Sequence, residues 1–160
     1  LVRQHCPRSF VLRTAWLYGR HGNNFVATML RLMRERPELN VVADQHGTPT
    51  WTRTLANTIL ELIRRDIQAY GIYHVTDNGQ TTWHEFACEI QRQALARGLL
   101  SREIPIRAIA SRDYPSRAPR PAYSVLSKDK IQAMLGHVLP EWKSSLSAFL
   151  DELASTAPVP

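Results

Sequence analysis

Three stretches of the chain combine polar side chains with glycine or proline, and each follows a run expected to form a strand. They are residues 16–24, 44–51 and 112–124. Open α/β sheets bind their ligands at the carboxyl ends of strands, where such loops meet. These loops are therefore the first candidates for a ligand site.

The side chains in these loops suit an anionic ligand. Asn23 and Asn24, at an expected helix start, can offer side-chain amides and free backbone N–H groups. Arg117 and Arg120, on a proline-rich loop, can chelate a phosphate in fork geometry, and Trp16 can stack on a sugar or a ring. An asparagine here is more often only a cap, and a strand-end tryptophan more often a core residue. It is the combination that favours a phosphorylated or nucleotide-like ligand.

The printed sequence contains none of the common catalytic motifs. No GxGxxG follows a strand, and no GxSxG, HExxH or P-loop occurs. Tyr and Lys never stand four residues apart, the closest spacing being the five residues from Tyr123 to Lys128. The six histidines and the two cysteines, Cys6 and Cys88, show no metal-ligand spacing. The residues by themselves indicate binding, without a convincing general base, nucleophile or metal site.

Alternating strands and helices are expected to position these loops. The apolar and β-branched run 9–18 predicts a strand that ends near Ala15 or Trp16, and similar runs predict strands at residues 39–43, 72–75 and 104–110. Helical spacing of apolar residues predicts helices at residues 24–36, 52–69, 82–97, 127–135 and from 140 onward. The segments 44–51 and 111–121 are expected to be polar loops. This alternation predicts an α/β fold.

Local signals predict where several helices begin and end. Asn23 or Asn24 is expected to cap one helix, and Thr82 with Glu85 fits a capping box at the start of another. Gly71 is expected to end the helix 52–69. These signals depend on near neighbours only.

Composition and charge indicate a globular protein without a membrane-spanning segment and with a preference for anionic partners. With 160 residues, of which 44% are hydrophobic and 21% charged, the chain has a globular composition. Its apolar runs are far shorter than the roughly 20 residues that span a membrane. The net charge of +6 favours anionic partners, with scattered solvated arginines or nucleic-acid binding as alternatives. Two lone cysteines favour a reducing compartment such as the cytoplasm.

Five segments together resemble the C-terminal half of the dTDP-4-dehydrorhamnose reductases, a family of extended short-chain dehydrogenases. In order, they are RTAWLYGRHGNNFVATML, VVADQHGTPTWTRTLA, GIYHVTDNGQTTWHEFA, RAPRPAYSVLSKDKI and LPEWKSSLSAFLDEL. The resemblance covers nearly the whole chain. It implies a Rossmann-like α/β fold in which residues 1–160 are a C-terminal fragment.

The resemblance also implies a division of the chain. Residues 9–18 and 71–75 would be the last strands of the dinucleotide-binding sheet. Residues 19–70 and 76–154 would form the nucleotide-sugar-binding lobe.

The activity implied by the resemblance is reduction of dTDP-4-dehydro-L-rhamnose to dTDP-L-rhamnose with NADPH or NADH. In the family, the glycine-rich loop and the Tyr-x-x-x-Lys pair lie in the N-terminal half. A C-terminal piece would therefore explain the absence of these motifs and of an initial Met. Such a piece is expected to be inactive alone. A non-catalytic regulatory subunit and another nucleotide-sugar epimerase or dehydratase are alternatives, and a nucleic-acid-binding module is the least favoured.

The resemblance assigns roles to particular positions. Thr14 and Ala15 would lie beside the cofactor. The dTDP-sugar would be contacted by Trp16, Asn23, Asn24, Gln45, Thr48, Pro49, Thr50, Arg120 and Ser124. No nucleic-acid or membrane partner is expected.

The resemblance also bears on assembly. Some relatives dimerise around a magnesium ion. Glu152 fits one ligand position, but Arg53 occupies another, which argues against a metal-bridged dimer. The strands at 9–18 and 72–75 would leave exposed edges, so self-association of the fragment is expected.

Overall fold

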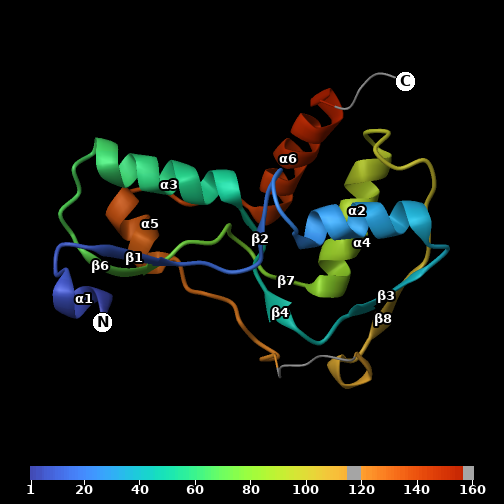
Figure 1. The fold of residues 1–160 in the computed structure, drawn as a ribbon, viewed down its shortest axis with the longest axis horizontal. Helices are drawn as coiled ribbons and strands as arrows, with labels where there is room; N and C mark the ends of the chain where they lie inside the picture. The colour runs from blue at the N-terminus through green and yellow to red at the C-terminus, as the bar shows by residue number, and fades with distance from the viewer. Residues whose placement is uncertain (115–119, 157–160) are drawn as a thin grey trace.

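Helices and short strands alternate along the residues that the structure describes, 1–114 and 120–156 of a computed structural model (Figure 1). The helices are α1 (Val2–His5), α2 (Phe25–Glu35), α3 (Thr52–Arg64), α4 (Trp83–Leu95), α5 (Asp129–Leu135) and α6 (Trp142–Thr156). The strands are β1 (Phe10–Arg13), β2 (Leu17–Tyr18), β3 (Leu39–Val42), β4 (His46–Gly47), β5 (Thr50–Trp51), β6 (Gly71–His74), β7 (Thr81–Thr82) and β8 (Ile106–Ile109). A 3₁₀ turn covers Ser111–Asp113.

The strands pair two by two. β1 with β6, β2 with β5 and β3 with β8 are parallel, and β4 with β7 is antiparallel. Parallel neighbours need a crossover connection, and helices supply it here. The predicted α/β class is therefore confirmed.

The buried side chains form two clusters. Figure 1 shows α2 and α4, which carry much of one cluster, on the opposite side of the view from α3 and α5, which contribute to the other. One cluster fills the space among α2, α4 and α6 and is centred on Phe86, Ile90 and Leu146, none of which is exposed to solvent. The other lies where α3 and α5 cover the β1–β6 pair and contains Tyr73 and Ile131. The loops that join the two ends carry most of the predicted site residues.

The strand predicted to end near Ala15 or Trp16 is β1, which ends slightly earlier, at Arg13. The chain then turns at Trp16, whose φ of +48° lies in the left-handed region. As a result β1 pairs with β6, while β2 turns away to pair with β5. The Trp16 carbonyl accepts a hydrogen bond from the Thr50 N–H at 3.1 Å, which fixes the turn.

Two further boundaries differ from the prediction. Residues 44–51 are not a polar loop, because they contain β4 and β5 and pair with strands elsewhere in the chain. The helix predicted over residues 52–69 ends at Arg64, since Asp66 takes a left-handed conformation with φ of +45°. Gly71, expected to end that helix, instead begins β6.

The two signals for helix starts are confirmed. The Asn24 side chain accepts from the Ala27 N–H at 3.0 Å, so Asn24 is the cap of α2. Thr82 and Glu85 form the reciprocal capping box of α4. Within residues 1–114 and 120–156, no helix has the length and apolar character needed to cross a membrane.

Candidate ligand site

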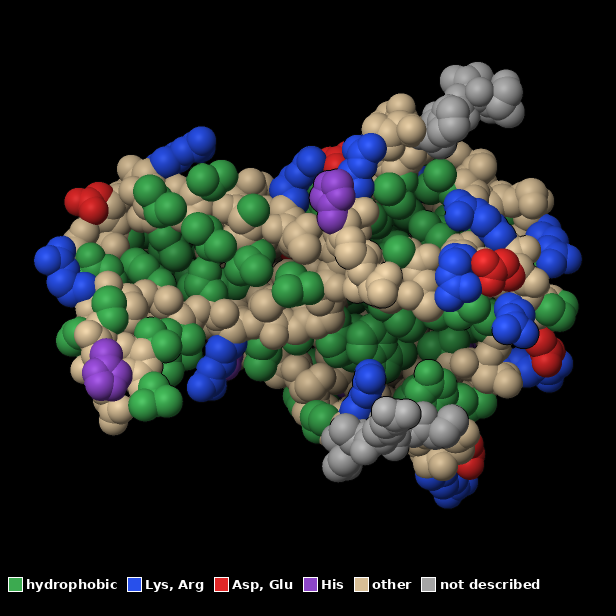
Figure 2. Space-filling view, in the orientation of Figure 1, with side chains coloured by type: hydrophobic (Ala, Val, Ile, Leu, Met, Phe, Trp, Pro, Cys, Tyr) green, Lys and Arg blue, Asp and Glu red, His purple; other side chains and the backbone are tan. Residues whose placement is uncertain are grey.

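A pocket of about 250 Å³ opens among α2, β3 and the start of α4. Its lining residues are Phe25, Met29, Asn40, Val41, Val42, Gln45, Trp83, Ser111, Tyr114 and Arg120. Figure 2 shows apolar side chains gathered between α2 and the β3–β8 pair, with basic side chains around them. We call this the aromatic pocket, because three of its lining residues carry aromatic rings.

The rings come from the first turns of two helices. Phe25 is the first residue of α2 and Trp83 the first of α4, and their ring centroids are 4.6 Å apart. Trp16 does not line the pocket but stacks on Trp83, with centroids 3.5 Å apart and planes at 12°. The caps of α2 and α4 therefore position the rings of Phe25 and Trp83 at the pocket.

The polar part of the pocket includes two of the predicted site residues. Gln45 is 9% exposed, whereas Arg120 is exposed at the surface, and both line the pocket. Nearby, the backbone N–H of Ser111 and its hydroxyl donate to the Asp44 carboxylate at 3.0 Å. These hydrogen bonds, the backbone one first, lower the pKa of Asp44, so an anion is held beside Gln45. Arg117, the other arginine predicted to bind phosphate, lies outside the described residues.

Three other predicted site residues lie near the pocket without lining it. The amide of Asn24 is engaged within its own loop, donating to the Gly19 carbonyl at 2.8 Å, while Asn23 is exposed. Ser124 donates to the His46 carbonyl from both its hydroxyl, at 3.0 Å, and its backbone N–H, at 2.9 Å. Asn24 and Ser124 thus hold the segments that carry Phe25 and Arg120.

Thr48 and Pro49 connect β4 to β5, Thr50 is the first residue of β5, and all three are buried. Thr48 donates to the Gly79 carbonyl at 2.9 Å, so its hydroxyl is engaged in the fold. The Thr50 hydroxyl is buried without a partner among the described residues. None of the three lines the aromatic pocket.

Thr14 and Ala15, the residues predicted to face a cofactor, lie between β1 and Trp16. The Thr14 hydroxyl is buried, and within the described part of the chain it has no hydrogen-bond partner. Such an unpaired hydroxyl at the carboxyl end of a strand is free to bond a polar group of a ligand.

Sequence reasoning missed Phe25, Trp83 and Tyr114 as pocket residues. For Phe25 and Trp83 a signal was present, because each directly follows a predicted helix cap, Asn24 or Thr82. Tyr114 carries no such local signal; it follows the 3₁₀ turn and lines the pocket together with residues far away in sequence.

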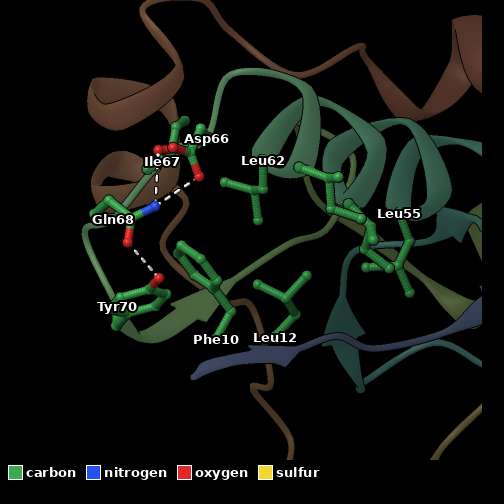
Figure 3. Close-up of a pocket in the computed structure, with 10 residues that line it drawn as sticks. Phe10, Leu12, Leu55, Leu62, Asp66, Ile67, Gln68 and Tyr70 are labelled. Carbon is green, nitrogen blue, oxygen red and sulfur yellow. Dashed lines mark hydrogen bonds between the residues drawn. The ribbon is translucent and has the colours of Figure 1, made fainter. Parts of the chain in front are cut away.

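A second hollow is larger and more apolar (Figure 3). This apolar groove, about 600 Å³, runs between β1 and α3. It is lined by Phe10, Leu12, Leu55, Ile59, Leu62, Ile63, Asp66, Ile67, Gln68 and Tyr70. It holds no basic side chain and suits an apolar surface, so the aromatic pocket is the better site for an anion.

No metal centre is found among the described residues, where no group of three His, Cys, Asp or Glu side chains is placed to hold an ion. The two positions considered for a magnesium ion, Arg53 and Glu152, form an ion pair with each other.

Comparison with known proteins identifies close relatives. The family profile described as "RmlD substrate binding domain" matches residues 1–155. The chain is 36% identical to the dTDP-4-dehydrorhamnose reductase of Shigella flexneri, over 99% of this chain and 54% of that protein. The chain thus spans about half the length of the curated relatives it matches.

Solved structures agree with this match. A dTDP-4-dehydrorhamnose reductase ortholog from Clostridium acetobutylicum superimposes with a TM-score of 0.85 at 39% identity, covering 95% of this chain and 51% of that one. The reductase of Bacillus anthracis, solved in complex with NADP, gives a TM-score of 0.79 at 37% identity over 91% of this chain and 48% of that one.

Proposed function

Because the chain belongs to the RmlD substrate binding domain family, we propose that it is the nucleotide-sugar-binding part of a dTDP-4-dehydrorhamnose reductase. The observation that carries this proposal is the aromatic pocket, in which Phe25, Trp83 and Tyr114 lie with Gln45 and Arg120. Aromatic rings beside an amide and a guanidinium suit a pyrimidine base linked to a diphosphate.

Each part of the pocket has a proposed role. The rings of Phe25 and Trp83 hold the thymine, and the buried amide of Gln45 bonds its polar edge. Arg120 binds the diphosphate with a forked guanidinium. Trp16, stacked on Trp83, lies toward the deoxysugar.

A nicotinamide cofactor, NADPH or NADH, would contact this chain at Thr14 and Ala15. The buried, unpaired hydroxyl of Thr14 supports this placement, because a cofactor amide would satisfy it. When bound, the cofactor supplies the hydride for the C4 ketone. The 160 residues contain no Tyr-x-x-x-Lys pair, so we infer that they bind the sugar nucleotide and do not reduce it alone.

The proposed partner is thus a dTDP-sugar, rather than nucleic acid or a membrane, and the proposed location is the cytoplasm. Cys6 and Cys88 are both free thiols, which fits a reducing compartment.

We propose that the chain self-associates without a magnesium bridge. The apolar groove exposes Ile59 and Ile63, and β1 and β6 form a pair with no further strand among the described residues. Apolar surface beside a free strand edge favours association with a second copy. Arg53 neutralises Glu152, so a cation is not expected to bind there.

Calorimetric titration of the chain with dTDP and dTDP-L-rhamnose tests the proposed ligand. A hydrogen bond to a charged group contributes about 1.5–3 kcal/mol, so Arg120→Ala should weaken binding by roughly ten- to a hundredfold. Arg64→Ala, which removes the same charge from the end of α3, is the matched control and should bind as the wild type does. Equal affinities of the two variants would contradict the proposed diphosphate site.

A further inference from the structure

Trp16 is held in a conformation that a bulky residue rarely adopts. Its φ of +48° lies in the left-handed region, which costs roughly 1–2 kcal/mol for a residue with a Cβ. Its side chain is neither at the surface nor fully buried. Contacts elsewhere must therefore offset the backbone cost, and they also decide where the indole lies.

Two contacts of Trp16 are evident. Its ring stacks on Trp83 at 3.5 Å, and its carbonyl accepts from the Thr50 N–H at 3.1 Å. Stacked aromatic pairs contribute about 0.5–1.5 kcal/mol beyond the area they bury, which is comparable to the backbone cost.

The third contact is with Gly47. A Cβ placed on Gly47 would overlap Cε2 and Cζ2 of the Trp16 ring and lie 2.8 Å from its Nε1. The φ of Gly47 is not in the left-handed region, so the position does not need glycine for its backbone. It needs glycine for space, because the edge of the Trp16 indole lies directly against the backbone of β4.

The sheet brings these residues together from distant parts of the chain. β4 pairs antiparallel with β7, which places Gly47 opposite Thr81, two residues before Trp83. Thr82 caps α4 and thereby fixes the helix that begins at Trp83. Gly47 on β4 and Trp83, directly after β7, are thus brought together by this antiparallel pair, and both contact the Trp16 ring.

We propose that Gly47 is a positioning residue that, with Trp83, seats the Trp16 indole as the platform for the deoxysugar of the dTDP-sugar. This inference rests on the proposed function. Gly47 touches no ligand itself; it acts through the ring of Trp16. A side chain at position 47 displaces that ring and removes the sugar contact, while the base and diphosphate contacts at Gln45 and Arg120 remain.

A double-mutant cycle tests this proposal, because residues that act through one another are not additive. The variants are Gly47→Ala, Trp16→Ala and the double variant, with Trp142→Phe as a control in the core. The readouts are the melting temperature and the affinities for dTDP-L-rhamnose and dTDP. The circular-dichroism couplet of the stacked Trp16–Trp83 pair reports the position of the indole.

Gly47→Ala should lose the couplet and weaken dTDP-L-rhamnose binding roughly three- to tenfold, with dTDP binding unchanged. In the Trp16→Ala background, Gly47→Ala should cost nothing further in affinity or in melting temperature. If Gly47→Ala alone does not fold, the double variant should fold, since the ring that the Cβ would strike is gone. Trp142→Phe should keep both the couplet and the affinities.

Two results would overturn the proposal: additive losses in the cycle, or equal wild-type affinities for dTDP and dTDP-L-rhamnose. A wild type that binds neither nucleotide would instead overturn the proposed function. The melting temperatures would still decide whether Gly47 acts through Trp16.

Discussion

Arg120 and Asp77 illustrate two opposite environments for a charged side chain. Arg120 is exposed, so its guanidinium keeps its hydration until a ligand binds. Asp77 is fully buried, and its Oδ2 accepts from the Trp51 N–H at 3.1 Å. Burial raises the pKa of Asp77 above its ordinary value, and the hydrogen bonds from Thr54 and Trp51, which lower it, do not offset the burial. The first residue serves binding, and the second affects stability.

Asp77→Asn should therefore stabilise the protein at neutral pH. Because the folded pKa lies above the unfolded value of about 3.9, the folded state binds the proton more tightly. The wild type then loses stability as pH rises from about 4 through the folded pKa. The Asp77→Asn variant does not, because its amide does not ionise. In melting curves from pH 4 to pH 7, the melting temperature of Asp77→Asn should exceed that of the wild type by an amount that grows with pH and then levels off. If instead the wild type melted at the higher temperature, by an amount that grew with pH, the result would contradict this account.

At the scale of elements, the capped starts of helices were predictable and the short strands were not. Asn24 and the pair Thr82–Glu85 cap their helices through bonds to residues three positions away, so the signal is local. The turn at Trp16 depends on Thr50 and on Gly47, which lie over 30 residues away. Strands of two residues, such as β4 and β7, exist only because a distant partner pairs with them.

In the candidate site, too, some residues could be predicted from the sequence and others depend on tertiary contacts. Arg120, predicted from its loop and from the resemblance, and Gln45, predicted from the resemblance, both line the pocket. Trp16, also predicted as a contact residue, stacks on Trp83 beside the pocket, and no sequence spacing encodes that tertiary contact.

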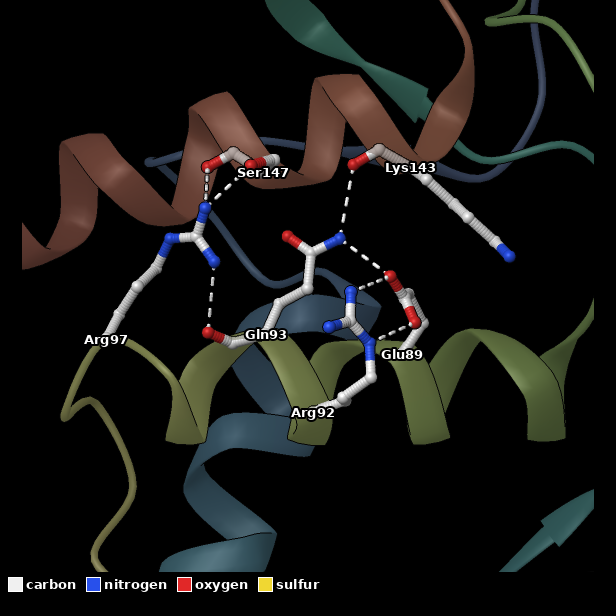
Figure 4. A network of polar contacts seen from close by, with 6 residues as sticks. All are labelled: Glu89, Arg92, Gln93, Arg97, Lys143 and Ser147. Atoms are coloured by element: carbon white, nitrogen blue, oxygen red, sulfur yellow. Dashed lines mark hydrogen bonds and ion pairs between the residues drawn. The ribbon is translucent and has the colours of Figure 1, made fainter.

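Helix α4 connects the pocket to the core. Its first residue lines the pocket, and its later turns are joined to α6 by polar contacts (Figure 4). Gln93 donates to Glu89 at 2.8 Å and to the Lys143 carbonyl at 3.2 Å, and Arg97 donates to the Ser147 hydroxyl at 2.6 Å. The position of Trp83 is thus set at one end by the capping box and along the helix by α6.

The contribution of the capping box to stability should be measurable as a change in melting temperature. Thr82→Ala removes the acceptor of the Glu85 N–H, and loss of a helix cap typically costs about 1 kcal/mol. For a domain of this size, that is a fall of roughly 2–4 °C in Tm. Thr82→Ser, which keeps the hydroxyl, should recover most of the loss, and Thr156→Ala at the end of α6 should change little. A loss in Thr82→Ala no greater than in Thr156→Ala would show that the cap is not stabilising.

At the scale of the whole molecule, the two hollows have different chemistry. The aromatic pocket lies with α2 and α4, and the apolar groove lies at the other end between β1 and α3 (Figures 2 and 3). Ile63 in the groove is 68% exposed, an unusual exposure for an isoleucine beside other apolar residues. One end of the molecule is suited to a nucleotide and the other to a protein surface.

Ile63→Lys should therefore reduce self-association. A lysine in the groove must be desolvated when the apolar face is covered, which opposes the contact. Light scattering across a dilution series should show larger species for the wild type than for Ile63→Lys. Val138→Lys, which changes an exposed apolar residue outside the groove, should behave as the wild type does. A wild type that stays monomeric at every concentration would contradict the proposed association.

The most direct test of the account uses the four tryptophans as reporters. Indole N–H signals in ¹H–¹⁵N spectra should be followed while dTDP-L-rhamnose is added to the chain. The account predicts that the signals of Trp16 and Trp83 shift and saturate, while those of Trp51 and Trp142, buried in the core away from the aromatic pocket, stay in place. Shifts confined to Trp51 and Trp142, or no shift in any of the four, would contradict the claim that the aromatic pocket binds a dTDP-sugar.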